Sequence, residues 1–324
     1  MDRFREITEQ TRHVKDLRLV LYEVVEVGMA VLFFALLTRL FFFQAFTVPS
    51  PAMEGTLLPG DRFFANRLVY GLKLPFSDKI LLRFKRPRMG EVAVFRDPGL
   101  MGRLSVRRCI AGPGQTVHLT DKKVFVDGAE FRFPATARSG GTVSIEERFS
   151  PRDTFHPFRI PQPGERIRID TLPLREFDFL SSLIRQENPE SRFTITADLM
   201  KGNLPCDLPD LADLRMDLLQ QDSLPSLDRM NWIQLSNVLN FLTSRGDSAV
   251  YSIRRVLYRD GVQVKEYPVR RRHFFFMGDN WDDSEDSRFT GLIMEDLIVA
   301  RASFTYWSAS PQGGLRWSRL FLFL

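Results

Sequence analysis

Cysteine and histidine are scarce in this sequence of 324 residues. The two cysteines, Cys109 and Cys206, are too few for a disulfide scaffold or a four-cysteine zinc site. The chain has four histidines and neither an HExxH nor a CxxC motif, so we expect no metal site and no cofactor. The net charge of +5 is also small. It excludes the strongly basic balance of many nucleic-acid-binding proteins, but it permits contact with an anionic membrane surface.

What the chain does have is enough apolar material to fold. Hydrophobic residues make up 44% and charged residues 26%, which excludes a disordered protein. The length predicts one large or two medium domains. The 29 phenylalanines are the unusual feature of the composition.

An apolar run near the N-terminus is long enough to cross a membrane. It extends over residues 24–46 and is interrupted only by Glu26 and Arg39. A hydrocarbon core of ~30 Å needs roughly 20 helical residues. Residues 1–20 carry five Lys or Arg, whereas residues 40–60 carry none, so the positive-inside rule places the N-terminus in the cytoplasm. We therefore predict three parts in order along the chain: a cytoplasmic segment at 1–22, a transmembrane helix at 23–46 and an extracytoplasmic domain at 47–324.

Two other interpretations of this run stay open. It could be a secretory signal peptide, with Ser50-Pro51-Ala52 resembling a small-x-small cleavage site, although Pro51 lies inside that site. It could also be a helix buried in the core.

The exported part is dominated by short β-prone runs. These lie at residues 91–98, 105–117, 122–131, 258–269, 273–280 and 300–308. Asp127-Gly128 and Asp260-Gly261 each stand between two such runs, which is a hairpin signal. The pattern predicts a mainly β, barrel-like domain.

A stretch at about 165–248 interrupts this pattern. Apolar residues recur at helical spacing in 175–186, 209–221 and 227–244, and prolines separate these pieces. We predict a mainly helical insertion in the β domain, with the apolar stripes forming its core.

Three groups of residues, found in a fixed order, carry a family resemblance. They are FFFQAFTVPSPAMEGTLLPGD at 41–61, MGEVAVFRDPG with SVRRCIAGPGQTV at 89–117, and FFFMGDNWDDSEDSRFTG at 274–291. In this order, behind an apolar run, they resemble type I signal peptidases. These are membrane-anchored serine endopeptidases that remove signal peptides from exported proteins. The resemblance covers roughly residues 30–135 and 265–321 and leaves the insertion out.

The resemblance implies a catalytic serine activated by a buried, neutral lysine. The serine belongs to a P-S-x-S-M pattern, and the lysine precedes an arginine in a later strand. This chain departs from the family at both positions: Ala52 stands in place of the nucleophile and Arg107 in place of the base. Alanine has no nucleophilic group, and arginine holds its proton near neutral pH. In the same loop, Pro51 replaces the usual Gly and Gly55 the usual Pro.

Other site residues match the family pattern, whereas Trp281 and Asp283 depart from the usual Arg and Asn. The resemblance assigns Ser50 to the oxyanion hole, Met53 to packing at the cleft, and Ser284 to a hydrogen bond with the base. It also predicts that Asp279 pairs with Arg108 and that Asp286 pairs with Arg288. The alternative is that these residues only hold the β core together.

Two functions follow from these observations, and a membrane scaffold without peptide binding is a third interpretation. In the first, the chain is a catalytically inactive member of the family that binds signal peptides or an active signal peptidase. In the second, it is an active signal peptidase with a substitute nucleophile such as Ser50, although no neutral lysine evidently stands beside it. In both, we expect a single-pass protein of the bacterial cytoplasmic membrane, in contact with the lipid bilayer and not with nucleic acid.

Overall fold

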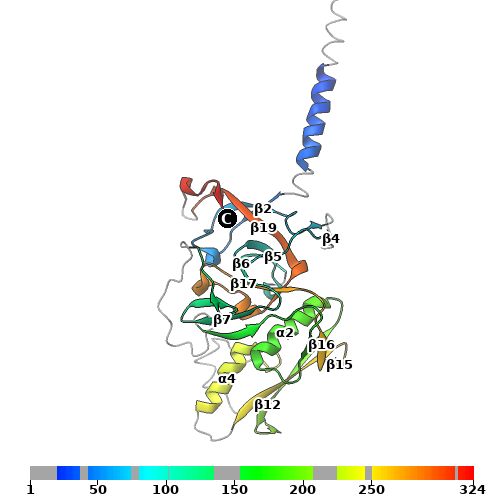
Figure 1. Ribbon diagram of the computed structural model, residues 1–324, viewed down its shortest axis with the longest axis vertical. Coiled ribbons are helices and arrows are strands. Elements are labelled where there is room, and N and C mark those ends of the chain that lie inside the picture. The colour runs from blue at the N-terminus through cyan, green and yellow to red at the C-terminus, as the bar shows by residue number, and fades with distance from the viewer. Residues whose placement is uncertain are drawn as a thin grey trace, which may run out of the picture.

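The computed structural model of the chain is mainly β, as predicted (Figure 1). It describes residues 20–36, 43–73, 80–100, 102–134, 154–206, 225–244, 250–310 and 313–324. Two long helices lie in the insertion, α2 (Leu174–Glu187) and α4 (Trp232–Ser244). Short helical turns connect the strands: η1 (Pro51–Met53), η2 (Pro98–Leu100), η4 (Trp281–Asp283), α5 (Ser287–Thr290), η5 (Glu295–Leu297) and η6 (Trp317–Arg319).

The largest sheet combines strands from both ends of the chain. Its order is β1-β2-β19-β5-β6-β17-β18, with β20 paired to β19. The strands are β1 (Phe43–Thr47), β2 (Asp61–Asn66), β5 (Val92–Arg96), β6 (Leu104–Ala111), β17 (His273–Met277), β18 (Ile293–Met294), β19 (Ile298–Ser308) and β20 (Leu322–Phe323). Because β6 pairs with β17, residues near 107 lie beside residues near 277, although the insertion separates them in sequence.

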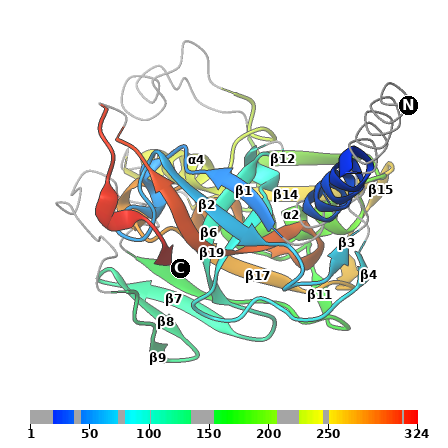
Figure 2. The ribbon, with the colours of Figure 1, turned by 90° about the horizontal axis from the view of Figure 1, so that it is seen from above.

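A second sheet lies beside the first and is built around a predicted hairpin (Figure 2). Its strands are, in order, β10 (Phe155–Arg159), β7 (Thr116–Thr120), β8 (Lys123–Val126) and β9 (Ala129–Glu130). Asp127 and Gly128 both have positive φ, 52° and 82°, which is the backbone of a tight hairpin turn. A separate two-stranded pair is formed by β3 (Leu72–Lys73) and β4 (Ile80–Leu82).

The stretch predicted as a helical insertion, residues 165–248, contains strands as well as helices. Its strands β12 (Phe193–Lys201) and β13 (Leu204–Pro205) belong to a sheet of the order β13-β12-β14-β15, completed by β14 (Tyr251–Arg259) and β15 (Val262–Gln263) beyond residue 248. The helical stripes in α2 and α4 are buried as expected, but β12 also alternates between more and less exposed residues, and its period of two was overlooked. The helix predicted at 209–221 lies outside the described residues.

A polar link ties the insertion's elements together. Asp178 of α2 forms an ion pair with Arg255 of β14, and its other carboxylate oxygen accepts a hydrogen bond of 2.6 Å from the Trp232 amide at the start of α4. The insertion is joined to the β domain by β11 (Arg166–Arg168), which pairs with β16 (Glu266–Pro268).

Phenylalanine side chains connect the insertion to the β domain. Phe177 and Phe179 of α2 belong to the same buried cluster as Phe155 and Phe275 of the sheets. Burying one such side chain is worth about 1.5–3 kcal/mol. The insertion is therefore packed into the main core through α2, whereas α4 contributes mostly to a second cluster with Leu199.

The N-terminal helix covers residues 20–36 and extends from one end of the molecule (Figure 1). In the part of the chain that the structure describes, no helix is both long and apolar enough to cross a membrane. Residues 43–46, which we expected at the end of a transmembrane helix, instead belong to β1 and pair with β2. The alternation in Phe43–Thr47, in which less and more exposed side chains follow each other, suits a strand at a sheet edge.

Candidate functional site

The loop that carries position 52 is held by its backbone. Pro51 begins the short helix η1, where its missing amide proton is no loss, and Ser50 before it is extended. The Ala52 carbonyl accepts a hydrogen bond of 3.1 Å from the Asn280 amide, and the Pro51 carbonyl accepts one of 3.2 Å from Asn280 Nδ2. Ala52 is buried, with 3% of its surface exposed. Asn280 thus attaches this loop to the turn that follows β17.

Gly55 gives the same loop a conformation that the family's usual residue cannot adopt. Its φ is +103°, whereas proline fixes φ near −65°. The backbone folds back at this point, and the Thr56 and Leu57 amides both donate to the Met53 carbonyl, at 3.0 and 2.8 Å. Met53 is fully buried and packs into the core with Leu57, whereas its role at a substrate cleft stays a prediction.

Arg107 takes the position of the family's base and is nearly buried, with 8% of its surface exposed. It donates one hydrogen bond of 2.7 Å to the Val106 carbonyl and one of 3.1 Å to the Glu285 carbonyl. Burial lowers the pKa of Arg107, while the carboxylates of Asp286 and Asp97 act in the opposite direction. Because the ordinary pKa of arginine lies far above neutrality, the side chain remains a cation and cannot accept a proton.

The neighbouring Arg108 forms the ion pair predicted for it. Its Nε and one terminal nitrogen bind the two carboxylate oxygens of Asp279 at 2.8 and 2.5 Å. Thr56 adds a hydroxyl that donates to the same carboxylate, and Arg108 also donates to the Gly90 carbonyl at 2.6 Å. Asp279 is fully buried, so this pair holds together the loop at 50–57, strand β6 and the turn after β17.

A second buried pair, also predicted, lies a few residues further on. Arg288 donates to both oxygens of Asp286, at 2.9 and 2.8 Å, and to the Trp281 carbonyl at 2.7 Å. Burial by itself would raise the pKa of Asp286, but Arg288 and the Gly278 amide outweigh it and hold that pKa below its usual value. The carboxylate is therefore charged at neutral pH and fixes the turn.

Ser284 makes no hydrogen bond with its hydroxyl inside the described residues, although that oxygen is buried. The bond to residue 107 that the family resemblance implies is absent, because the Arg107 guanidinium reaches the Glu285 carbonyl instead. Gly278 lies between the Ser284 hydroxyl and the Ala52 carbonyl oxygen. A Cβ at Gly278 would stand 2.4 Å from Ser284 Oγ and 2.4 Å from the Ala52 carbonyl oxygen, so only glycine fits there.

Sequence reasoning did not single out Thr56, Gly278 or Asn280. Each contacts residues more than two hundred positions away in the sequence, or acts through the backbone. Such contacts produce no pattern of charge or hydrophobicity in the sequence. Gly278 and Asn280 do lie in the GDN sequence that carried the family resemblance, which is the signal that could have identified them.

The described site contains neither a free nucleophile at position 52 nor an amine at position 107. Lys122, one of the lysines near the β-rich core, forms an ion pair with Asp282, with Nζ to Oδ2 at 3.1 Å. In the described part of the chain, no group of three or more His, Cys, Asp or Glu side chains is placed to hold a metal ion. The described arrangement therefore presents no serine–lysine dyad.

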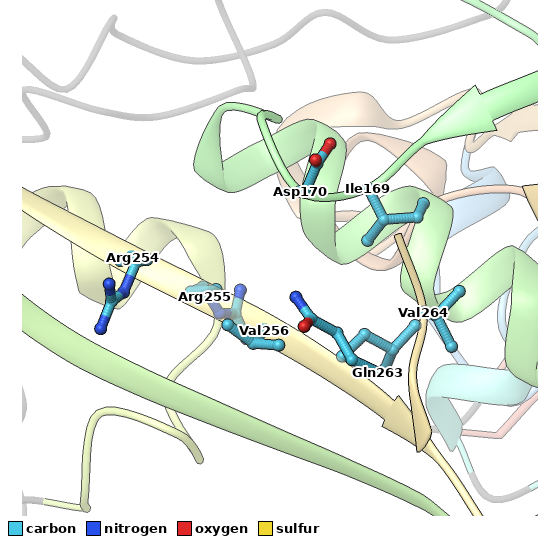
Figure 3. Close-up of a pocket in the computed structure, with 8 residues that line it drawn as sticks. Ile169, Asp170, Arg254, Arg255, Val256, Gln263 and Val264 are labelled. Atoms are coloured by element: carbon cyan, nitrogen blue, oxygen red, sulfur yellow. The ribbon is translucent and has the colours of Figure 1, made fainter. Parts of the chain in front are cut away.

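A pocket of about 260 Å³ lies elsewhere, on the insertion (Figure 3). It is bounded by β14, by the β14–β15 hairpin and by the segment after β11, and its lining includes Arg255, Gln263 and Ile169. None of the site residues predicted from the sequence lines it. The Ala52 site and this pocket are thus built from different elements.

Comparison with known proteins identifies the family. The profile described as "Signal peptidase, peptidase S26" matches residues 21–170 and 240–307. A protein of Buchnera aphidicola subsp. Acyrthosiphon pisum named signal peptidase I is 36% identical over 268 residues, which cover 82% of this chain and 68% of that protein. Signal peptidase I of Buchnera aphidicola subsp. Baizongia pistaciae is 32% identical over 278 residues, covering 85% and 73%. That of Haemophilus influenzae is 25% identical over 292 residues, covering 88% and 70%. The chain therefore belongs to the signal peptidase family, peptidase S26.

Proposed function

We propose that this protein is a non-catalytic, membrane-anchored member of the signal peptidase family that binds signal peptides of exported precursors. The observation that carries the proposal is the pair Ala52 and Arg107 at the positions of the family's nucleophile and base. An active signal peptidase could be its partner in the same membrane, since the two would share substrates.

The chemical argument concerns what hydrolysis requires. A serine protease needs a hydroxyl to attack the peptide carbonyl and a neutral base to take the hydroxyl's proton. Removing such a unit costs roughly 10⁶-fold in kcat. Ala52 provides no hydroxyl, and Arg107 donates hydrogen bonds to two carbonyls and so cannot act as a base.

The argument for retained binding concerns the surroundings of the missing dyad. The buried pairs Arg108–Asp279 and Arg288–Asp286 and the close contact at Gly278 hold the loops around position 52 in one arrangement. Buried ion pairs are costly when one partner is lost, so such a network persists only while both partners do. A site with this frame and no dyad is suited to binding without turnover.

The alternative is an active enzyme that uses Ser50. The Ser50 side chain does not cap η1, so its hydroxyl is not committed to that bond. A base is what this alternative lacks, because Lys122 is engaged with Asp282. Ser50 activity would need a lysine that the described site does not place beside it.

The membrane anchor rests on the apolar N-terminal run and on exposed aromatic side chains. All residues of the helix at 20–36 are exposed, and most are apolar, so the helix needs an apolar cover. Phe43, Trp317 and Phe323 are exposed as well, the last at 82%. We propose that the part of the run that precedes β1 crosses the bacterial cytoplasmic membrane with the N-terminus inside, and that these side chains rest in the outer leaflet. Flotation with liposomes and protease protection in inverted vesicles test this topology.

A cleavage assay tests the inactive state. The full chain, purified in detergent, is incubated with a precursor that carries a small-x-small site. We expect no cleavage above the spontaneous rate. Turnover that disappears in Ser50→Ala would contradict the proposal and establish the alternative. A stable complex of the full chain with the uncleaved precursor, measured by fluorescence anisotropy, supports the binding role.

Restoration of the dyad is the complementary experiment. Ala52→Ser combined with Arg107→Lys returns both functional groups, and Ala52→Ser alone is the matched control because it lacks the base. Cleavage by the double variant and not by the control would show that the peptide still binds with its scissile bond at position 52.

A further inference from the structure

Arg107 has more hydrogen-bond donors than its surroundings use. A guanidinium carries five N–H groups, and two of them reach the Val106 and Glu285 carbonyls. Nε is buried and has no acceptor within the described residues. A buried donor without an acceptor is unfavourable, so an acceptor from a ligand would be bound preferentially here.

A second unsatisfied group stands beside it. Ser284 precedes Glu285, the residue whose carbonyl Arg107 contacts, and its buried hydroxyl also has no partner in the described part of the chain. The same hydroxyl lies against Gly278, as the Ala52 carbonyl oxygen does. The Ser284 hydroxyl therefore lies close to the Ala52 carbonyl, and Arg107 contacts the residue that follows Ser284.

The charges at this corner are of both signs, but at short range they are paired unevenly. The carboxylates of Asp279 and Asp286 are each bound at short range by an arginine, Arg108 and Arg288. Arg107 has no carboxylate within ion-pair distance among the described residues, although Asp286, Asp97 and Glu285 attract it, and Arg288 repels it, from further away. A guanidinium binds a carboxylate through two parallel, charge-assisted hydrogen bonds.

We propose that the Ala52–Arg107 corner binds the free C-terminal carboxylate of a peptide, so that an already cleaved signal peptide binds more tightly than the intact precursor. The inference rests on the proposed function, because it assumes that signal peptides occupy this site. It follows from the position of Arg107: where the family places the base at the scissile bond, this chain places a cation with spare donors, which matches a chain end that bears a negative charge. The orphan Ser284 hydroxyl supplies a further donor to the same carboxylate.

The test compares three peptides of one signal sequence on the full chain in detergent. The first ends after the small residue with a free carboxylate, the second ends there with an amide, and the third continues beyond it. We expect the acid to bind about tenfold or more tightly than the other two, as measured by fluorescence anisotropy. Equal affinities for acid and amide would overturn the inference and leave the proposed function standing. Binding of none of the three would overturn both.

Two variants assign the effect to Arg107. In Arg107→Gln the affinities for the acid and for the amide should become about equal, whatever the change in overall affinity. Arg254→Gln is the matched control, since Arg254 is an exposed arginine on the insertion that pairs with Asp198, and it should keep the full preference. A preference that survives in Arg107→Gln contradicts the assignment.

One further peptide distinguishes a C-terminal carboxylate from a side-chain carboxylate. It is amidated and has aspartate as its last residue, so its only nearby carboxylate belongs to a side chain. Binding of this peptide as tight as that of the acid would overturn the assignment to the C-terminal carboxylate.

Discussion

The two segments that meet at the site are held in different ways. The loop at 50–57 is held mainly by backbone hydrogen bonds, such as those from Asn280 to Ala52 and from Leu57 to Met53. The turn at 278–288 is held by buried side-chain ion pairs. The first segment departs from the family pattern at Pro51, Ala52 and Gly55. The second departs from it at Trp281 and Asp283 and keeps the residues of its buried ion pairs. The comparison teaches that a residue in a buried ion pair cannot change alone, whereas residues outside these pairs have changed in both segments.

Breaking a buried pair should have the largest effect. Asp286→Ala leaves the fully buried Arg288 without its carboxylate, and we expect a loss of about 3–5 kcal/mol in the free energy of unfolding. Urea denaturation followed by tryptophan fluorescence measures it. Asp198→Ala is the control, because its pair with Arg254 is exposed and should contribute less than about 1 kcal/mol. Similar losses in both variants would contradict the comparison.

Acid should weaken the strand that leads into the turn. Burial lowers the pKa of His273, at the start of β17, to about 4, against the effects of the Arg271 carbonyl and of Asp296. Glu187 also faces its ring, with Nδ1 to Oε1 at 3.8 Å. The unfolded chain, with an ordinary histidine pKa of about 6.5, binds the proton first, so stability falls as the pH drops below that value.

The expected loss from His273 is about 2 kcal/mol between pH 7.5 and pH 5. The measurement compares denaturation midpoints at both pH values for the wild type and for His273→Gln. The variant should lose less stability than the wild type over the same range. An identical pH dependence in the two proteins would show that His273 is not buried in its neutral form.

Restoring the family's proline should destabilise the loop. Gly55→Pro introduces a residue whose φ cannot reach +103°, so we expect a loss of more than about 1 kcal/mol. Thermal unfolding with and without the substitution measures it. Increased stability in Gly55→Pro would show that the loop can adopt the family's path, and it would remove one reason for the altered site.

The smallest effect is expected at position 52 itself. Ala52→Ser leaves the carbonyl and its hydrogen bond from Asn280 in place, so stability should change by about 1 kcal/mol or less. Differential scanning fluorimetry is sensitive enough for this comparison. A larger loss of stability would mean that the site cannot accommodate a side chain larger than the Ala52 methyl group.

Much of the β framework could be predicted from the sequence because its signals are local. The Asp127-Gly128 and Asp260-Gly261 turns have the positive φ values that these residue pairs favour, and strands flank both. β1 and β12 were missed for different reasons. β1 is the continuation of an apolar run, which hides its period of two, and β12 lies between two helices whose stronger pattern dominated the interpretation.

The two ion pairs of the site were predictable from the family resemblance, whereas the backbone contacts were not. The structure contains both pairs that the resemblance implies, Arg108 with Asp279 and Arg288 with Asp286. The role of Asn280 depends on hydrogen bonds to carbonyls of the loop at 50–57, and that of Gly278 on the space between two oxygens. No property of a single sequence specifies such distances.

The pairing of β11 with β16 has a consequence for how this chain varies in length. The polypeptide leaves the β domain through β11 and returns to it through β16, and these two strands are paired with each other. Doubling the length of a closed loop costs only about 0.6 kcal/mol in chain entropy. The stretch between β11 and β16 can therefore lengthen without shifting the register between β6 and β17. The family profile skips residues 171–239, which lie within that stretch. An insertion attached in this way can lengthen while the main sheet keeps its strand pairing.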